Sequence, residues 1–135
     1  IAPGNLHPFI LDQTSADRGA RNYERVLAEL GFRYDIILLS SGEDNHVGAL
    51  YPYHHSLADK HHGFIVVDDS LKPPPERMTS SLSLMQTAEA AVLLFVGEAK
   101  RKAFEKFNDA VCPAAACPEK LVLAIKDATV FTDLS

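Results

Sequence analysis

The chain has 135 residues, 47% of them hydrophobic, and a formal net charge of -5. This length suits one domain with a sizeable core, and no apolar run approaches the roughly 20 residues that cross a bilayer. The acidic balance gives no electrostatic footprint for nucleic acid, and the N-terminus has no signal-peptide pattern. The composition therefore predicts a soluble, cytoplasmic protein with no nucleic-acid partner and no membrane partner.

The first thirty residues predict a strand followed by a helix. Residues Leu6 to Leu11 have strand character, and Pro8 suits the edge or the end of a sheet. Thr14 and Ser15 are candidate N-caps of a helix, because apolar side chains then recur at helical spacing up to a stop signal at Gly31. The charged side chains between them predict an amphipathic helix with one solvated face.

A buried strand is predicted for residues 34–39, and a small polar turn of residues 40–42 follows it. The turn delivers Glu43, Asp44 and His46 to the end of the strand. Ligands of open α/β sheets bind beyond the carboxyl ends of the strands, so acids and a histidine at this place indicate a functional site.

The middle of the chain alternates between apolar runs and irregular sequence. Val47 to Tyr51 has room for one or two helical turns, and Gly63 to Asp69 predicts a second buried strand. The segment K-P-P-P-E-R-M-T then contains three prolines, which predict an extended approach to Arg77. Residues Ser81 to Ala88 have helical character.

The last third predicts two more strands. Ala91 to Val96 is a third buried strand, Gly97 opens a helix, and Leu121 to Ile125 is a final buried strand. The tail from Asp127 is compatible with a short helix or a strand. Near-continuous apolar strands between helices predict an α/β fold, with a layered, mostly parallel sheet and flanking helices.

Cysteines and histidines give little indication of a metal. Cys112 and Cys117 lack nearby partner ligands, so we expect two thiols, with an incidental disulfide as the alternative. The pairs His54-His55 and His61-His62 lack the usual zinc-ligand spacing. We expect surface histidines there, and no metal site.

Four residues suggest chemistry on a phosphorylated substrate. Asp44 and His46 are two apart in a turn, so the carboxylate can orient the imidazole of a general base. Lys100 lies in the first turn after Gly97, which is typical of a phosphate seat at a helix N-terminus, and Arg77 can add a bidentate contact. The alternative is a chance D-x-H pair with two ordinary surface charges.

Three motifs occur in an order that resembles the 6-phosphogluconolactonase family: G-E-D-N-H-V-G-A-L-Y-P, K-P-P-P-E-R-M-T and F-V-G-E-A-K. The resemblance implies hydrolysis of 6-phosphoglucono-lactone, a phosphorylated sugar lactone, to 6-phosphogluconate without a cofactor. It implies that His46 activates water with Asp44 beside it, and that Arg77 and Lys100 hold the phosphate.

The resemblance covers the C-terminal half of that family's fold. Its glycine-rich phosphate loop and D-E-R motif, which belong to the N-terminal half, have no counterpart in these residues. We therefore expect residues 1–135 to form a single α/β domain that is the C-terminal portion of a longer one. The expected partner is the missing N-terminal half or a second copy.

Two positions bear on activity. Glucosamine-6-phosphate deaminases, the sister family, carry a glutamate where this chain has Tyr51, so the tyrosine favours hydrolysis. Asn45 replaces the glycine of the family's D-G-H turn, which Gly42 opens, and asparagine tolerates a positive φ better than most residues. The alternatives are a deaminase or isomerase, and a non-catalytic module that binds a sugar phosphate or a protein.

Overall fold

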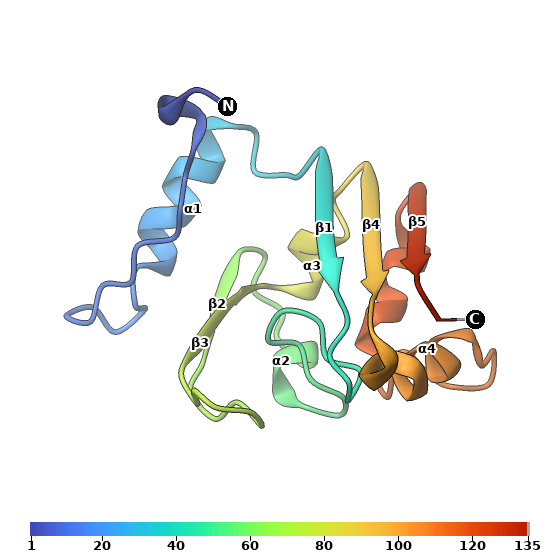
Figure 1. The fold of residues 1–135 in the computed structure, drawn as a ribbon. Helices are drawn as coiled ribbons and strands as arrows, with labels where there is room; N and C mark the ends of the chain where they lie inside the picture. The colour runs from blue at the N-terminus through green and yellow to red at the C-terminus, as the bar shows by residue number, and fades with distance from the viewer. Residues whose placement is uncertain (135) are drawn as a thin grey trace.

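The computed structural model describes residues 1–134 and has an α/β architecture. A parallel sheet contains three strands in the order β1-β4-β5, and a separate antiparallel ribbon joins β2 to β3 (Figure 1). The strands are β1 (Ile36–Ser40), β2 (Phe64–Val67), β3 (Arg77–Ser80), β4 (Ala90–Phe95) and β5 (Asp127–Thr132). The α-helices are α1 (Ala20–Glu29), α2 (His55–Ala58), α3 (Leu82–Met85) and α4 (Arg101–Asn108). The 3₁₀ helices are η1 (Pro3–Asn5), η2 (Glu98–Lys100) and η3 (Pro118–Ala124).

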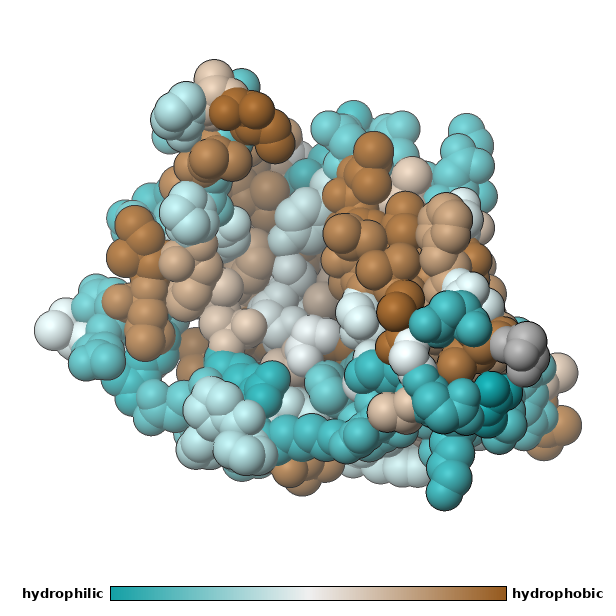
Figure 2. Space-filling view, viewed as in Figure 1, coloured by the Kyte–Doolittle hydropathy of each residue, from teal (hydrophilic) through white to brown (hydrophobic). Residues whose placement is uncertain are grey.

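One face of the parallel sheet is buried and the other is largely open. On central strand β4, the side chains of Ala91, Leu93 and Phe95 are fully buried and alternate with half-buried ones. On β1, Ile36 and Leu38 point to the opposite face, where each is 69% exposed. Figure 2 shows this open face as a hydrophobic patch over the sheet. The buried face carries the elements that position the candidate site. Among residues 1–134, no element packs over the open face.

Helix α1 packs on the antiparallel ribbon rather than on the parallel sheet (Figure 1). Its contact is a second small core, in which the Tyr23 ring lies 4.9 Å from the Phe64 ring. The predicted start of this helix at Thr14 or Ser15 is wrong. The carboxylates of Asp12 and Asp17 accept hydrogen bonds from nearby main-chain N–H groups, and these local bonds favour turns before Ala20.

The predicted strand from Leu6 to Leu11 is also wrong. The segment is non-regular and mostly exposed, and it lies along α1, where the hydroxyl of Tyr23 donates to the carbonyl of His7 at 2.6 Å. Pro8 has no N–H to give to a ladder, and the apolar side chains here find no sheet edge to join.

The predicted strand from Gly63 to Asp69 is confirmed as β2, but its place in a parallel sheet is wrong. β2 pairs antiparallel with β3, a strand that the sequence analysis missed. The proline run leads to Arg77, the first residue of β3, but the predicted extended approach is wrong, because residues 71–75 form a series of bends with a cis peptide bond between Pro73 and Pro74. A connection of this length suits a hairpin, because a parallel pair needs a longer crossover.

Two further expectations need correction. Val47 to Tyr51 forms no helix, because a bridge between Val47 and Leu50 closes a tight turn around Gly48, whose φ is +61°. The apolar run from Leu121 to Ile125 belongs mainly to η3, a 3₁₀ helix that buries Leu121 and Val122 and leaves Leu123 64% exposed. A short apolar run has the same composition in either structure. The tail from Asp127 is a strand, β5.

The remaining elements occur where they were predicted. The strands predicted at 34–39 and 91–96 are β1 and β4, and the helical segment at 81–88 contains α3. The prediction that the first of these strands is buried is wrong, because Ile36 and Leu38 are each 69% exposed. Gly97 precedes η2 and α4, as expected for a glycine that opens a helical segment. Among residues 1–134, no helix is long and apolar enough to cross a membrane.

Candidate active site

The loop that follows β1 folds back on itself at the carboxyl end of the parallel sheet. The main-chain N–H of Ser41 donates to the carbonyl of Leu94 at 3.0 Å, which extends the pairing of β1 with β4. The N–H of Gly42 donates to the carbonyl of His46 at 2.7 Å and closes the turn. The turn is therefore anchored to the central strand.

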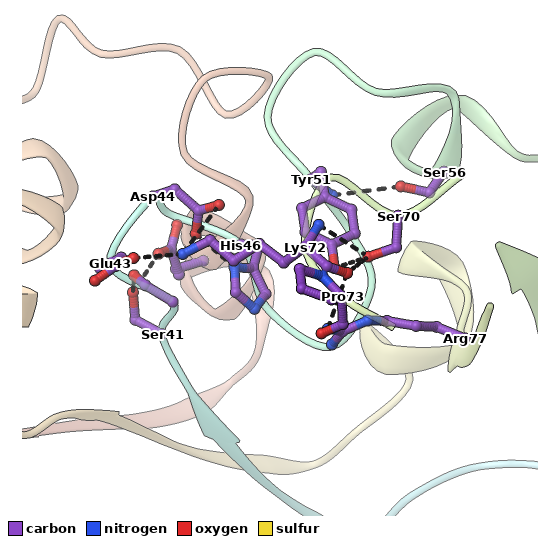
Figure 3. A network of polar contacts seen from close by, with 12 residues as sticks. Ser41, Glu43, Asp44, His46, Tyr51, Ser56, Ser70, Lys72, Pro73 and Arg77 are labelled. Atoms are coloured by element: carbon purple, nitrogen blue, oxygen red, sulfur yellow. Dashed lines mark hydrogen bonds and ion pairs between the residues drawn. The ribbon is translucent and has the colours of Figure 1, made fainter. Parts of the chain in front are cut away.

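Within this turn, Asp44 and His46 form the pair that the sequence predicted. Nδ1 of His46 lies 2.5 Å from Oδ1 of Asp44, and the two side chains are 18% and 34% exposed (Figure 3). No described residue hydrogen-bonds to Nε2 of His46, so the second ring nitrogen remains available. This is the geometry of a general base held by a carboxylate.

Gly42 is required by the close approach of that pair. A Cβ atom built on Gly42 would lie 2.1 Å from Nδ1 of His46 and 2.7 Å from Oδ1 of Asp44. Both distances are shorter than any van der Waals contact, so a side chain at this position would displace the imidazole. The glycine makes room for the pair.

Asn45 fits the turn and also ties it to the rest of the fold. Its φ is +67°, as the family comparison with glycine led us to expect. The side chain is buried, and Nδ2 donates to the carbonyl of Ala103 in α4 at 3.0 Å. A glycine would allow the same backbone, but it could not make this bond.

A buried polar cluster lies behind the turn. The hydroxyl of Ser41 donates to Oε1 of Glu119 at 2.5 Å, and Glu119 is fully buried. Burial, with the neighbouring Glu119 carboxyl, raises the pKa of Cys117 to about 12. Cys112 and Cys117 are both free thiols, as expected. No motif surrounds Glu119, so sequence patterns could not indicate its contact with Ser41.

Lys72 lies beside the acidic side chains of the turn, and the sequence analysis gave it no role. Its Nζ is 2.6 Å from Oε1 of Glu43 and 3.8 Å from Oδ2 of Asp44. The hydrogen bond from Lys72 holds the pKa of Glu43 below its ordinary value. Burial pushes the pKa of Asp44 up, but the hydrogen bond with His46 and the charges of His46 and Lys72 outweigh it and lower the pKa. One sequence signal did point to Lys72, because it is the first residue of the K-P-P-P-E-R-M-T motif.

Tyr51 links the turn to the proline loop. Its fully buried ring lies 5.0 Å from the imidazole of His46, and its hydroxyl lies 2.6 Å from Oγ of Ser70. Ser70 in turn donates to the carbonyl of Lys72 at 2.8 Å. Figure 3 shows this network running from Asp44 to Arg77.

The two predicted phosphate ligands have different surroundings. The guanidinium of Arg77 donates from Nε and Nη2 to the carbonyls of residues 72–74, with the shortest bond, 2.9 Å, to Pro73. Lys100 ends η2 and is half-buried, and its side-chain ammonium forms no hydrogen bond or ion pair within residues 1–134. The hydrogen bond and the charge of Lys72 are the larger causes of the lowered pKa of Glu43, and the charge of Lys100 adds a smaller contribution.

The histidine pairs differ from the expectation at one position. His54 is only 10% exposed and packs its ring against Tyr51, so the prediction of a surface residue is wrong there. His55, His61 and His62 are exposed, as expected.

Comparison with known proteins finds a matching family and several similar sequences. Residues 1–131 match the family described as glucosamine-6-phosphate isomerases/6-phosphogluconolactonase. The chain is 35% identical over 107 residues to probable 6-phosphogluconolactonase 1 of Arabidopsis thaliana, covering 70% of the chain and 40% of that protein. It is 31% identical over 139 residues to probable 6-phosphogluconolactonase 4, chloroplastic, of Oryza sativa subsp. indica, covering 92% and 43%. The chain thus spans about two fifths of these relatives.

Solved structures share the fold. The 6-phosphogluconolactonase from Thermotoga maritima superposes with a TM-score of 0.75 at 22% identity, over 98% of this chain and 57% of that one. A monomeric glucosamine-6-phosphate deaminase superposes with a TM-score of 0.68 at 21% identity, over 92% and 56%. At these identities the superpositions show a common fold, and they do not separate the two activities.

Proposed function

The chain belongs to the glucosamine-6-phosphate isomerase/6-phosphogluconolactonase family, and from this premise we propose that it carries the catalytic base of a 6-phosphogluconolactonase. The observation that carries the proposal is the contact of 2.5 Å between Nδ1 of His46 and Oδ1 of Asp44. Ester hydrolysis near neutral pH needs a base of this kind, and an imidazole held by a carboxylate supplies it.

The proposed reaction uses the free nitrogen of His46. Nε2 takes a proton from water while the water oxygen attacks the lactone carbonyl, and Asp44 stabilises the imidazolium that forms. The tetrahedral intermediate then collapses, the bond from the carbonyl carbon to the ring oxygen breaks, and His46 returns the proton to that oxygen. The product is the open-chain acid, 6-phosphogluconate.

We assign the substrate phosphate to Lys100 and Arg77. Lys100 has no counter-ion among the described residues, so its ammonium is available to an anion. Arg77 donates from Nε and Nη2 to loop carbonyls. A guanidinium has five N–H groups, so those on Nη1 remain available to a phosphate. Lys72 is paired with Glu43 and lowers the pKa of both Glu43 and Asp44.

The test is hydrolysis of freshly prepared 6-phosphoglucono-lactone by the full-length protein. Replacing His46 with Ala is expected to lower kcat by about 10²-fold or more, because general-base catalysis contributes on this scale. His62→Ala, an exposed histidine that the mechanism does not use, is the matched control. Equal rates for the wild type and His46→Ala, both above spontaneous hydrolysis, would overturn the role of His46.

A non-catalytic sugar-phosphate module is the second candidate, because the chain spans only about two fifths of its plant relatives. Binding of 6-phosphogluconate without turnover, lost in Lys100→Ala, is the result that this candidate predicts. A deaminase is disfavoured because Tyr51, at the position of the deaminase glutamate, is buried and hydrogen-bonded to Ser70. Release of ammonia from glucosamine 6-phosphate would reverse that preference.

We propose that the remainder of the family domain covers the open face of the sheet. The support is the exposed Ile36 and Leu38, together with the 57% coverage of the Thermotoga maritima structure. In the full-length protein, Leu38→Glu should then reduce the free energy of unfolding by roughly 2 kcal/mol, the value of a buried leucine. Val111→Glu is the control, since Val111 is 88% exposed. Equal effects of the two substitutions would contradict the cover.

A further inference from the structure

Two histidines and an aspartate outside the proposed catalytic pair converge on one point. Nε2 of His55 lies 3.0 Å from both carboxylate oxygens of Asp69, and Nε2 of His54 lies 3.3 Å from Oδ1 of the same residue. One candidate ligand atom from each residue lies within 4.8 Å of the others.

His54 is the member that a simple hydrogen-bond cluster does not explain. Its side chain is 10% exposed, and its Nε2 is buried without a hydrogen-bond partner. The Asp69 oxygen lies 3.3 Å from this nitrogen but is not in hydrogen-bonding geometry. A buried ring nitrogen aimed at a carboxylate and a second imidazole is a polar group that an ion would satisfy.

We propose that His54, His55 and Asp69 form a binding site for a divalent transition metal of the zinc type. Zinc bonds of about 2.0–2.2 Å to nitrogen and oxygen place neighbouring ligands of a tetrahedron roughly 3.4 Å apart. The separations of 3.0 and 3.3 Å to Asp69 are close to that edge, so an ion fits with small side-chain shifts. Imidazole and carboxylate ligands together favour zinc, cobalt, nickel or copper over calcium or magnesium.

The other ring nitrogen of His54, Nδ1, contacts Ser56. Nδ1 lies 3.0 Å from Oγ of Ser56, and the main-chain N–H of Ser56 donates to it at 3.3 Å. When Nε2 binds the ion, the proton is on Nδ1, which then donates to Oγ of Ser56 instead of accepting from the Ser56 N–H. An outer hydrogen bond of this kind fixes the tautomer and the orientation of a metal-binding histidine.

The site joins two loops beside the catalytic turn. His54 and His55 begin α2, and Asp69 follows β2, directly before Ser70, whose hydroxyl holds Tyr51. A bound ion would fix the start of the proline loop to α2. The buried ring of Tyr51 contacts the rings of both His54 and His46. The role that we assign to the ion is to stabilise the loop, not to take part in the reaction.

Cobalt(II) and zinc(II) titrations of the metal-free full-length protein test the site. We expect one equivalent of Co²⁺ to give the visible d–d spectrum of a tetrahedral or five-coordinate ion, and Zn²⁺ to displace it and raise Tm. His55→Ala and Asp69→Asn should each weaken binding by 10-fold or more, because each removes one ligand at an exposed position. His62→Ala, an exposed histidine beside Ser83, should bind as the wild type does.

Two results would overturn the assignment. One is the absence of a d–d spectrum and of a Tm increase with either metal. The other is binding that His55→Ala and Asp69→Asn leave unchanged, which would place the ion elsewhere. His54→Ala is unsuitable as the main test, since it also removes the N-cap contact of α2 with Ser56.

Discussion

The side-chain amide of Asn45 donates to the main-chain carbonyl of Ala103 at 3.0 Å, which joins the turn that contains Asp44 and His46 to helix α4. Asn45 therefore has two roles, because its φ of +67° also shapes the turn. The residue that departs from the family's D-G-H pattern stabilises the turn through a contact that glycine lacks.

Asn45→Gly separates these roles. It keeps the backbone conformation and loses the hydrogen bond, so we expect a loss of about 1 kcal/mol in the free energy of unfolding. Asn45→Ala loses the same hydrogen bond and also places alanine in the left-handed region, which costs roughly another 1–2 kcal/mol. Urea unfolding of both variants measures the difference, with Asn108→Ala as an exposed control. An alanine variant as stable as the glycine variant would show that the backbone shifts to avoid the strain.

Gly42→Ala should inactivate the protein while leaving it folded. The new Cβ would meet the imidazole of His46, so the ring must rotate away from Asp44. We expect kcat for the lactone to fall by about 10²-fold, as for loss of a general base. Gly4→Ala is the matched control, because nothing lies within 4 Å of its added Cβ. Full activity of Gly42→Ala would contradict the proposed geometry.

Lys72→Met should raise the pKa of Glu43 and of Asp44, because Lys72 lowers both. A lowered pKa means that the ionised Asp44 stabilises the fold above its unfolded pKa, and that this stabilisation is lost as the pH falls. The substitution therefore moves that loss, and the acidic limb of the activity profile, to higher pH. NMR titration of the carboxyl carbon of Asp44 measures the change. Lys126→Met, at an exposed position, should leave the titration unchanged.

The two cysteines should differ in reactivity. Cys117 is fully buried with a pKa raised to about 12, whereas Cys112 is half-buried. At pH 8 a thiol reagent is expected to label Cys112 and to reach Cys117 only on unfolding, because the thiolate is the reactive form. A raised folded pKa also means that stability declines as the pH rises above the ordinary value of 9.0 towards 12. Rapid labelling of Cys117 in Cys112→Ser would contradict this environment.

The strands that lead into the site were predictable because they are long, apolar and followed by polar turns. Both β1 and β4 follow this pattern, and the Asp44 and His46 pair was found from its place after β1. The ribbon of β2 and β3 was not foreseen, because the prolines before Arg77 hide a strand of four residues. Leu121 and its neighbours were misassigned because a buried 3₁₀ helix and a buried strand share the same composition.

The residues that hold Asp44 and His46 in place were harder to predict than these two residues themselves. Lys72 and Glu119 reach the turn from distant segments, 29 and 78 residues away from Glu43 and Ser41. No local pattern reports such a contact, because it depends on how loops meet in three dimensions. His54 likewise looked like a surface residue until the fold placed Tyr51 against it.

The anchoring of the turn by Leu94, Ala103 and Glu119 determines when the site can form during synthesis. The residues of the turn leave the ribosome early, but each of their partners is made much later, and contacts over long separations form slowly. A nascent chain that ends before Glu119 therefore has the histidine and the aspartate without the surroundings that fix them. Ribosome-stalled chains of increasing length should gain protease resistance at this turn only after Glu119 has emerged.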